Sequence, residues 1–401
     1  MTHIANGNVP IYNQYTPENI KVFDRKKISL IDHLHRMPLG IKIGDIIYST
    51  FGYYNSISRI DVEKCKIDFL ELNVEEPYYG DSMHLVAYVD DEKMIFLPHR
   101  SPNLVLYDRK EKTGKEYFYG DTQLINYNKV LFNGNYLFLF PVFRKDIGVF
   151  DLKKNIVSHC DIGLERNSHN YDEGKMFAVV STFINKNKAF MLASNPNCVI
   201  EFDSDDRRIV YHDELFDCMS MCYDGLNYWI GKLDKCIVKT DFHSKKVFSH
   251  DDLPYEFEIS NTLPLSGALC IGKFVLFTSY RTNVILRVDT RVDEFSILSL
   301  PTALDENDVY NIVGYDKEKM YLFSPRQNVL IVSDVMLNTY RVKNVEWSEE
   351  CKRMMSENEK CLSDMVIDLK CFINHIKLKW GMKSTALKKV GRNIYDKVYY
   401  L

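Results

Sequence analysis

Basic side chains recur at one spacing in this chain, a few residues before an aspartate that ends a short apolar run. Forked guanidinium groups bind carboxylate, sulfate or phosphate through charge-assisted hydrogen bonds. We therefore expect a ligand-binding face lined by these residues, with solvated charged loops as the alternative. The positions eight residues before the aspartate, or seven for Arg144, hold Tyr53, Arg100, Arg144, Asn195, Arg281 and Arg326, and Lys232 and Lys235 bracket the matching position in the fifth repeat.

A second group of residues has the types needed for acid–base chemistry. His84 ends the segment 73–84, and His169 and Tyr171 stand together in the segment 164–176. A histidine beside a tyrosine and an arginine can abstract a proton next to a carboxylate while the arginine holds the negative charge, which is lyase chemistry. His84, His169 and Tyr171 are therefore candidates only, because sequence spacing does not show that they converge.

The short motifs of several enzyme classes are absent from the sequence. There is no glycine-rich phosphate loop after a strand, no G-x-S-x-G elbow, no H-E-x-x-H and no paired C-x-x-C. Cys218 with Cys222 and His33 with His35 are isolated pairs, whereas a zinc site needs four protein ligands, or three and a water. We expect no metal and no cofactor.

The aspartates that follow the basic positions define the elements, because they recur every 38 to 52 residues. Each repeat divides into four short strands; in the sixth these are GALCIG, KFVLFTS, NVILRVD and FSILSLP. Four strands in about 40–50 residues are typical of a propeller blade. We predict an all-β fold, a seven-bladed β-propeller over residues 39–347. The repeated aspartates are Asp61, Asp108, Asp151, Asp203, Asp241, Asp289 and Asp334.

These aspartates are predicted to be architectural. Each ends the third strand of its blade, where the carboxylate can accept hydrogen bonds from backbone N–H groups of the next turn. Hairpin turn sequences stand between the first and second strands, at 89–93, 132–135, 223–227 and 315–319. A further copy of the motif at Asp24, within residues 1–38, either closes the ring against the last blade or belongs to an eighth blade, which is the alternative to seven.

The pattern changes to that of a helix after Trp347. Ser348 is a typical N-cap, and acids follow it in the first turn. Residues 348–378 carry an apolar stripe at helical spacing, and residues 379–401 form a basic tail. We expect the helix to pack on the propeller; the alternative is a docking or assembly element. The stripe consists of Leu362, Met365, Val366, Leu369, Phe372, Ile373 and Ile376.

Bulk properties narrow the classes of partner. A net charge of −4 gives no case for nucleic acid as a partner. No basic segment followed by an apolar one stands at the N-terminus, and no stretch approaches the ~20 uncharged residues of a membrane span. We expect a cytoplasmic protein whose ten cysteines are reduced.

One blade resembles those of a known family. The segment TNVILRVDTRVDEFSILSLP (282–301) is similar to the N-x-I-x-R-x-D … L-P blades of virginiamycin B lyase and of NHL-type propellers. The tryptophan–aspartate signature of WD repeats and the paired glycine of kelch repeats are absent. The resemblance implies a propeller fold and carries no catalytic residue to this chain.

The sequence favours a binding or scaffold propeller whose arginine-bearing face recognises a protein partner or an anionic ligand. This interpretation rests on analogy between folds. The alternative is a lyase or hydrolase acting on an anionic small molecule or glycan, or an accessory protein of a biosynthetic cluster. An enzyme requires a histidine within hydrogen-bond reach of a tyrosine or carboxylate near the arginines.

Overall fold

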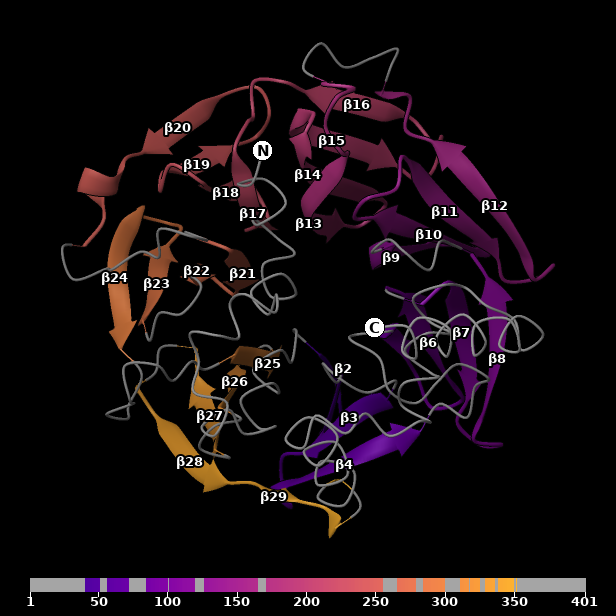
Figure 1. The fold of residues 1–401 in the computed structure, drawn as a ribbon. Helices are drawn as coiled ribbons and strands as arrows, with labels where there is room; N and C mark the ends of the chain where they lie inside the picture. Colours follow the sequence, from indigo (N-terminus) through magenta and orange to yellow (C-terminus); the bar gives the residue numbers. More distant parts are fainter. Residues whose placement is uncertain are drawn as a thin grey trace, which may run out of the picture.

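The computed structural model describes residues 40–50, 56–71, 84–99, 101–119, 126–164, 171–254, 265–278, 284–299, 311–316, 318–324, 329–335, 338–349 and 351. Within these residues, seven sheets stand around one axis like the blades of a propeller, as Figure 1 shows. Each blade has four antiparallel strands in chain order, with the first strand nearest the axis. The predicted all-β, seven-bladed propeller is confirmed.

The bounds of the strands follow the sequence repeat. Blades one to three consist of β1 (Ile41–Ile43), β2 (Ile46–Thr50), β3 (Ser56–Asp61) and β4 (Lys66–Glu71); β5 (His84–Val89), β6 (Lys93–Pro98), β7 (Asn103–Asp108) and β8 (Thr113–Phe118); and β9 (Tyr127–Asn133), β10 (Tyr136–Pro141), β11 (Asp146–Asp151) and β12 (Ile156–Asp161). Blades four and five consist of β13 (Ala178–Asn185), β14 (Lys188–Asn195), β15 (Asn197–Asp203) and β16 (Ile209–His212); and β17 (Cys218–Tyr223), β18 (Tyr228–Lys232), β19 (Ile237–Thr240) and β20 (Lys245–Phe248). Blades six and seven consist of β21 (Gly267–Ile271), β22 (Phe274–Thr278), β23 (Val284–Asp289) and β24 (Glu294–Ser299); and β25 (Asn311–Tyr315), β26 (Lys319–Ser324), β27 (Val329–Asp334) and β28 (Tyr340–Asn344).

The repeated aspartates hold the turns between third and fourth strands, as predicted. Asp108 Oδ1 accepts hydrogen bonds from the backbone N–H groups of Lys110 and Glu111, at 2.9 and 2.8 Å. An acceptor fixed at the end of a strand pairs donors that would otherwise face water, and so defines the turn. The same kind of bond is made by Asp61, Asp151, Asp203, Asp241, Asp289 and Asp334.

The core lies between blades. Successive side chains of a strand point to opposite faces of its sheet, so each blade can pack against both neighbours. On β10, Phe138 and Phe140 pack towards blade four, where Phe138 meets Phe202 with ring centroids 5.2 Å apart. Leu137 and Leu139 pack towards blade two. The near-continuous apolar runs of the inner strands are therefore required by burial on both sides.

A short strand at the end of the described chain closes the ring. β29 (Glu346–Trp347) pairs in parallel with β4 of blade one, with Trp347 opposite Ile67. Ser348 Oγ then accepts a hydrogen bond from the N–H of Cys351 at 3.2 Å, the bond expected of an N-cap. Apart from Ser348, Glu349 and Cys351, the predicted helix 348–378 lies outside the described residues, as do the segments 1–38 and 379–401.

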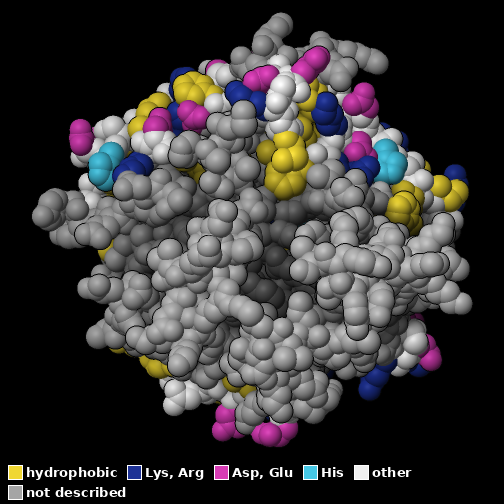
Figure 2. All heavy atoms as spheres, viewed as in Figure 1, with side chains coloured by type: hydrophobic (Ala, Val, Ile, Leu, Met, Phe, Trp, Pro, Cys, Tyr) yellow, Lys and Arg dark blue, Asp and Glu magenta, His cyan; other side chains and the backbone are white. Residues whose placement is uncertain are grey.

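The ring has two faces with different connections. We call the side that carries the loops between second and third strands, and the connections between blades, the loop face; the other side, with the hairpin turns, is the turn face. Figure 2 views the ring along its axis, as in Figure 1. None of the helices in the described part of the chain is long and apolar enough to cross a membrane.

Candidate functional site on the loop face

Six of the predicted site residues lie in the described structure: His84, Arg144, Tyr171, Asn195, Lys232 and Lys235. They do not form one group, since they belong to blade two, to the loop between β10 and β11, to the connection before blade four, to the end of β14 and to blade five. The amide of Asn195 donates to the backbone carbonyls of Asp172 and Lys175 and so supports that connection. The remaining candidates, which are Tyr53, Arg100, His169, Arg281 and Arg326, lie outside the described residues.

His84 is a buried residue at the start of β5. Its Nε2–H donates to the carbonyl oxygen of Asn103 at 3.0 Å, and burial lowers the pKa of its imidazole to about 3. Tyr171 packs beside the cluster shared by blades three and four, and the ammonium group of Lys145 lies 4.9 Å from its ring centroid. The described contacts of these two residues are those of packing and loop support.

Arg144 is the predicted cation with the most extensive contacts. Its Nε donates to Asp146 Oδ1 at 3.0 Å and its Nη2 donates to Asp146 Oδ2 at 3.2 Å, a forked pair on one edge of the guanidinium. The guanidinium also lies over the ring of Tyr127, 5.6 Å from its centroid. Although burial opposes it, the hydrogen bonds and charge of Asp146 raise the pKa of Arg144. The side chain is charged and held in one orientation.

Sequence reasoning missed a histidine beside this pair. His159, on β12, contacts Asp146 Oδ2 through Nδ1, so one carboxylate holds both the arginine and the imidazole. His159 stands opposite Gly148 in the β11–β12 register and reaches Asp146 diagonally across it. The period-two alternation of a strand places these residues on one face of the sheet. Basic candidates were selected by their spacing before the repeated aspartates, and His159 does not have that spacing.

Two buried tyrosines complete this cluster. A Cβ on Gly148 would lie 2.7 Å from Tyr119 Cε1 and 3.1 Å from Tyr127 Cζ, so both rings use the space that this glycine leaves. Burial, with the charge of Asp146 nearby, raises the pKa values of both phenols, which therefore keep their protons. Among the described residues, the Tyr119 hydroxyl has no hydrogen-bond partner.

Lys232 belongs to a different part of the loop face. Its Nζ donates to Asp234 Oδ2 at 3.2 Å and lies 4.2 Å from the ring centroid of Phe216. Phe216 and Leu233 are both 47% exposed, which is high for apolar side chains of this size. Figure 2 shows hydrophobic side chains among charged ones in the sector formed by β13–β20. We call Phe216 and Leu233 the apolar pair.

The loops that carry the apolar pair are fixed by the half-buried amide of Asn197. Asn197 donates to Asp217 Oδ1 at 2.8 Å and accepts from the Asp217 N–H at 2.7 Å. The carbonyl oxygen of Asp217 then accepts from the N–H of Leu233 at 2.8 Å. Because the loops are held before any partner binds, little conformational entropy remains to be lost on binding.

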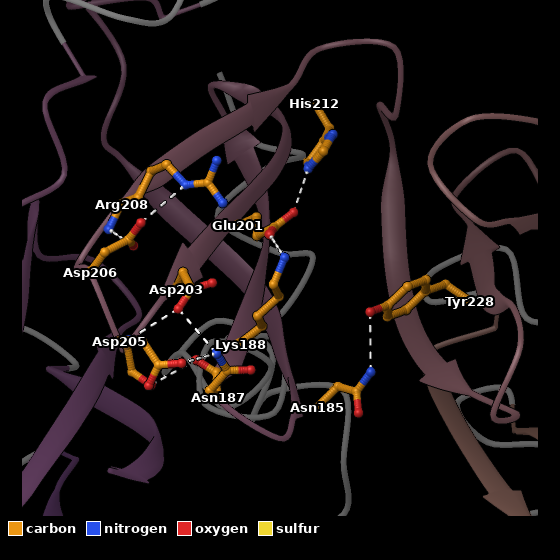
Figure 3. A network of polar contacts seen from close by, with 11 residues as sticks. Asn185, Asn187, Lys188, Glu201, Asp203, Asp205, Asp206, Arg208, His212 and Tyr228 are labelled. Carbon is orange, nitrogen blue, oxygen red and sulfur yellow. Dashed lines mark hydrogen bonds and ion pairs between the residues drawn. The ribbon is translucent and has the colours of Figure 1, made fainter. Parts of the chain in front are cut away.

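A separate polar network fills the space between blades four and five, as Figure 3 shows. Glu201, on β15, accepts from Lys188 Nζ at 2.6 Å, and its other oxygen lies 3.0 Å from Nε2 of His212. Asn185 donates across to the Tyr228 hydroxyl of blade five at 3.1 Å. In the described residues no group of three or more metal-ligating side chains has the geometry to hold an ion.

Comparison with known proteins adds to the description of the fold. No family model matches the chain, and no curated protein matches its sequence. Solved structures do match. Virginiamycin B lyase from Staphylococcus aureus superimposes with a TM-score of 0.53 at 14% identity, over 72% of this chain and 92% of that one.

Two further structures show the same similarity. A streptogramin B lyase gives a TM-score of 0.50 at 14% identity, over 69% of this chain and 86% of that chain. The computationally designed protein Ika8 gives 0.50 at 11% identity, over 77% and 87%. At these identities the likeness concerns the fold alone: the chain is a β-propeller, as the blade at 282–301 indicated.

Proposed function

We propose that this protein is a binding or scaffold module that holds a protein partner on its loop face. The observation that carries the proposal is the apolar pair, Phe216 and Leu233, which is 47% exposed at each residue on loops fixed by Asn197. Exposed aromatic and aliphatic side chains on a rigid surface are the usual anchors of an interface. Lys232, drawn over Phe216, adds a cation at its edge.

The basic residues extend the proposal to anionic groups. Asp146 takes two of the five N–H donors of the Arg144 guanidinium, and Tyr127 makes a further side-chain hydrogen bond with it. The donors that remain are proposed to bind a carboxylate or phosphate of the partner or of a small ligand. Tyr53, Arg100, Arg281 and Arg326 are proposed to add to this arginine-bearing face. The C-terminal segment 348–401 is proposed as a docking or assembly element.

The test uses two faces of one blade. Leu233 lies on the loop face of blade five, and Leu226, 81% exposed, lies in the hairpin turn on its turn face. A partner is captured with the tagged wild-type protein, identified, and its affinity measured for three variants. Phe216→Ser and Leu233→Ser should each weaken binding about 10–100-fold, whereas Leu226→Ser should leave it unchanged.

All three variants remove an exposed apolar side chain, so a general loss of stability does not explain a difference between them. Unchanged affinity in both Phe216→Ser and Leu233→Ser would exclude the apolar pair as the interface. Equal losses in all three variants would mean that binding does not distinguish the faces, and would contradict the proposal.

A second function, an enzyme, is favoured by one observation: His159 is oriented by Asp146 beside Arg144, as a general base would be. On a uronate-containing glycan, Nε2 of His159 would take the proton from the carbon next to the carboxylate. The electron pair would form a double bond while the glycosidic C–O bond breaks and its pair leaves with oxygen. A lyase would therefore raise ultraviolet absorbance on polyuronates, and His159→Gln would abolish the rise.

A further inference from the structure

Arg144 and His159 are placed to act on one ligand. Both contact the same oxygen of Asp146: Arg144 Nη2 donates to Oδ2 at 3.2 Å, and His159 Nδ1 also contacts Oδ2. The two side chains come from different elements, the β10–β11 loop and β12, and are brought together by this carboxylate. Two polar side chains on one oxygen lie close enough together to be considered as one site.

The imidazole of His159 presents one nitrogen away from the carboxylate. The carboxylate only accepts, so Nδ1 carries the proton of the bond, and in the neutral ring Nε2 is then an acceptor. The His159 side chain is 39% exposed, and its ring lies against Tyr119 with centroids 5.7 Å apart. The ring is therefore held on one side by Asp146, is supported by Tyr119 and is partly exposed.

The guanidinium of Arg144 has more donors than Asp146 takes. Asp146 takes one N–H from Nε and one from Nη2, and Tyr127 supports the guanidinium with its ring and through a side-chain hydrogen bond. A planar guanidinium can bind a second carboxylate through the N–H donors that these partners leave. The Arg144 side chain is 20% exposed, so these donors are partly withdrawn from bulk water, where charge-assisted bonds are stronger.

We propose that Arg144, Asp146 and His159 form a site for a hydroxycarboxylate, a small anion or terminal sugar acid that carries a carboxylate and a neighbouring hydroxyl group. Arg144 binds the carboxylate, and the hydroxyl donates to Nε2 of His159. Asp146 positions both side chains. The inference rests on the proposed anion recognition by the loop face and specifies its ligand class.

The requirement for two groups follows from charge. Arg144 and Asp146 together are neutral, so a carboxylate alone meets no net positive charge and gains little over water. A hydroxyl alone finds one acceptor at His159. Only a ligand with both groups uses the remaining donors and the acceptor at once, and the second bond forms without a second loss of translational freedom.

The experiment follows the imidazole signals of His159 by NMR in the full-length protein, assigned with His159→Gln. The probe is D-glucuronate. Glucose, which lacks the carboxylate, and cyclohexanecarboxylate, which lacks the hydroxyls, are its matched controls. We expect glucuronate to shift the His159 signals in a saturable titration, and each control to bind at least ~10-fold more weakly, as the loss of one charge-assisted or paired hydrogen bond implies.

Protein variants test the assigned roles. Arg144→Gln should weaken glucuronate binding ~10–100-fold and leave the weak binding of glucose unchanged. Arg208→Gln removes an exposed arginine paired with Asp206 in blade four, and should have no effect. Asp146→Asn should reduce binding and also move the His159 signals in the free protein, because the positioning bond is lost.

Two results would overturn the inference. In the first, glucuronate shifts the NMR signals of His159 no more than glucose does; in the second, glucuronate binds Arg144→Gln as tightly as it binds the wild type. The docking proposal is tested separately by Phe216→Ser, which should leave glucuronate binding intact. A protein that loses its partner in Phe216→Ser but never binds glucuronate keeps the proposed docking function and contradicts the ligand site.

Discussion

Glu201 shows how this fold places a carboxylate between blades. It is buried at 8% exposure, and Lys188 and His212 reach it from the strands on either side. The hydrogen bond with His212, followed by that with Lys188, lowers its pKa from 4.5 to about 2, although burial alone would raise it. The folded structure therefore stabilises the charged form of the Glu201 carboxylate relative to the unfolded chain.

This shift predicts a pH dependence of stability. A lowered pKa in the folded state contributes stability that is complete above pH 4.5, the ordinary value, and is lost as pH falls towards 2. Glu201→Gln removes that contribution, so the variant should be less stable than the wild type at pH 6, with the difference shrinking as the pH falls from 4.5. Urea unfolding at a series of pH values measures it.

Glu173→Gln, which changes an exposed carboxylate on the connection before blade four, is the control and should follow the wild-type curve. A difference between Glu201→Gln and the wild type that stays constant from pH 6 to pH 3 would contradict the account, because it would come from packing and not from charge.

At the residue scale, the sequence predicted the contacts between residues that lie close together in the chain. The repeated aspartates were predictable because their donors lie two or three residues further on, as in Asp151 with Lys153 and Lys154. The pairing of Arg144 with Asp146 is equally local, but the sequence showed Arg144 only as a free cation. His159 was missed because its partner lies 13 positions away, across Gly148, and only the strand register joins them.

At the scale of elements, a strand of two residues contributes to closing the ring. β29 adds a fifth, parallel strand to blade one, and Trp347 fills the cluster shared by blades one and seven, where its ring centroid lies 6.3 Å from that of Phe323. Lys343 Nζ adds a bond to the carbonyl oxygen of Val62 at 2.8 Å. Since an open ring would expose the faces of both terminal blades, the closing strand is expected to stabilise the whole.

Trp347→Ala is therefore expected to lower the free energy of unfolding by about 3–5 kcal/mol, the cost of truncating a large buried aromatic side chain. Chemical denaturation followed by fluorescence and circular dichroism measures the change. Tyr340→Ala, on the outer strand β28 and 46% exposed, serves as the control and should cost far less. Equal losses in the two variants would show that closure does not depend on Trp347.

The strands of the seven blades were predictable because few fold classes other than a propeller have a period of 38 to 52 residues with four apolar runs. The closing strand β29 was not predictable. It is two residues long and pairs with a strand some 280 positions earlier in the chain, and no local pattern encodes such a pairing. The sequence also predicted that residues 1–38 contribute to closure; they lie outside the described residues, so this stays a prediction beside the pairing of β29 with β4.

At the scale of the whole molecule, the ring is a support that separates two surfaces. Contacts between blades, such as Lys239 and Lys246 of blade five with Asp293 of blade six, join the sheets at 2.6 and 2.9 Å. The turn face is fixed by short hairpins with carboxylate acceptors. The loop face carries the apolar pair and Arg144, and so has both the anchors and the charges that recognition requires.

The central claim, that partners bind the loop face, is tested most directly by photo-crosslinking at matched positions of blade five. A photoreactive phenylalanine analogue is placed at Leu233 on the loop face or at Leu226 on the turn face, both exposed. With the captured partner present, we predict a discrete crosslink between position 233 and the partner. This crosslink should disappear when the Phe216→Ser substitution is added, and position 226 should give none. The same crosslinked species from both positions, or one from position 226 alone, would contradict the account.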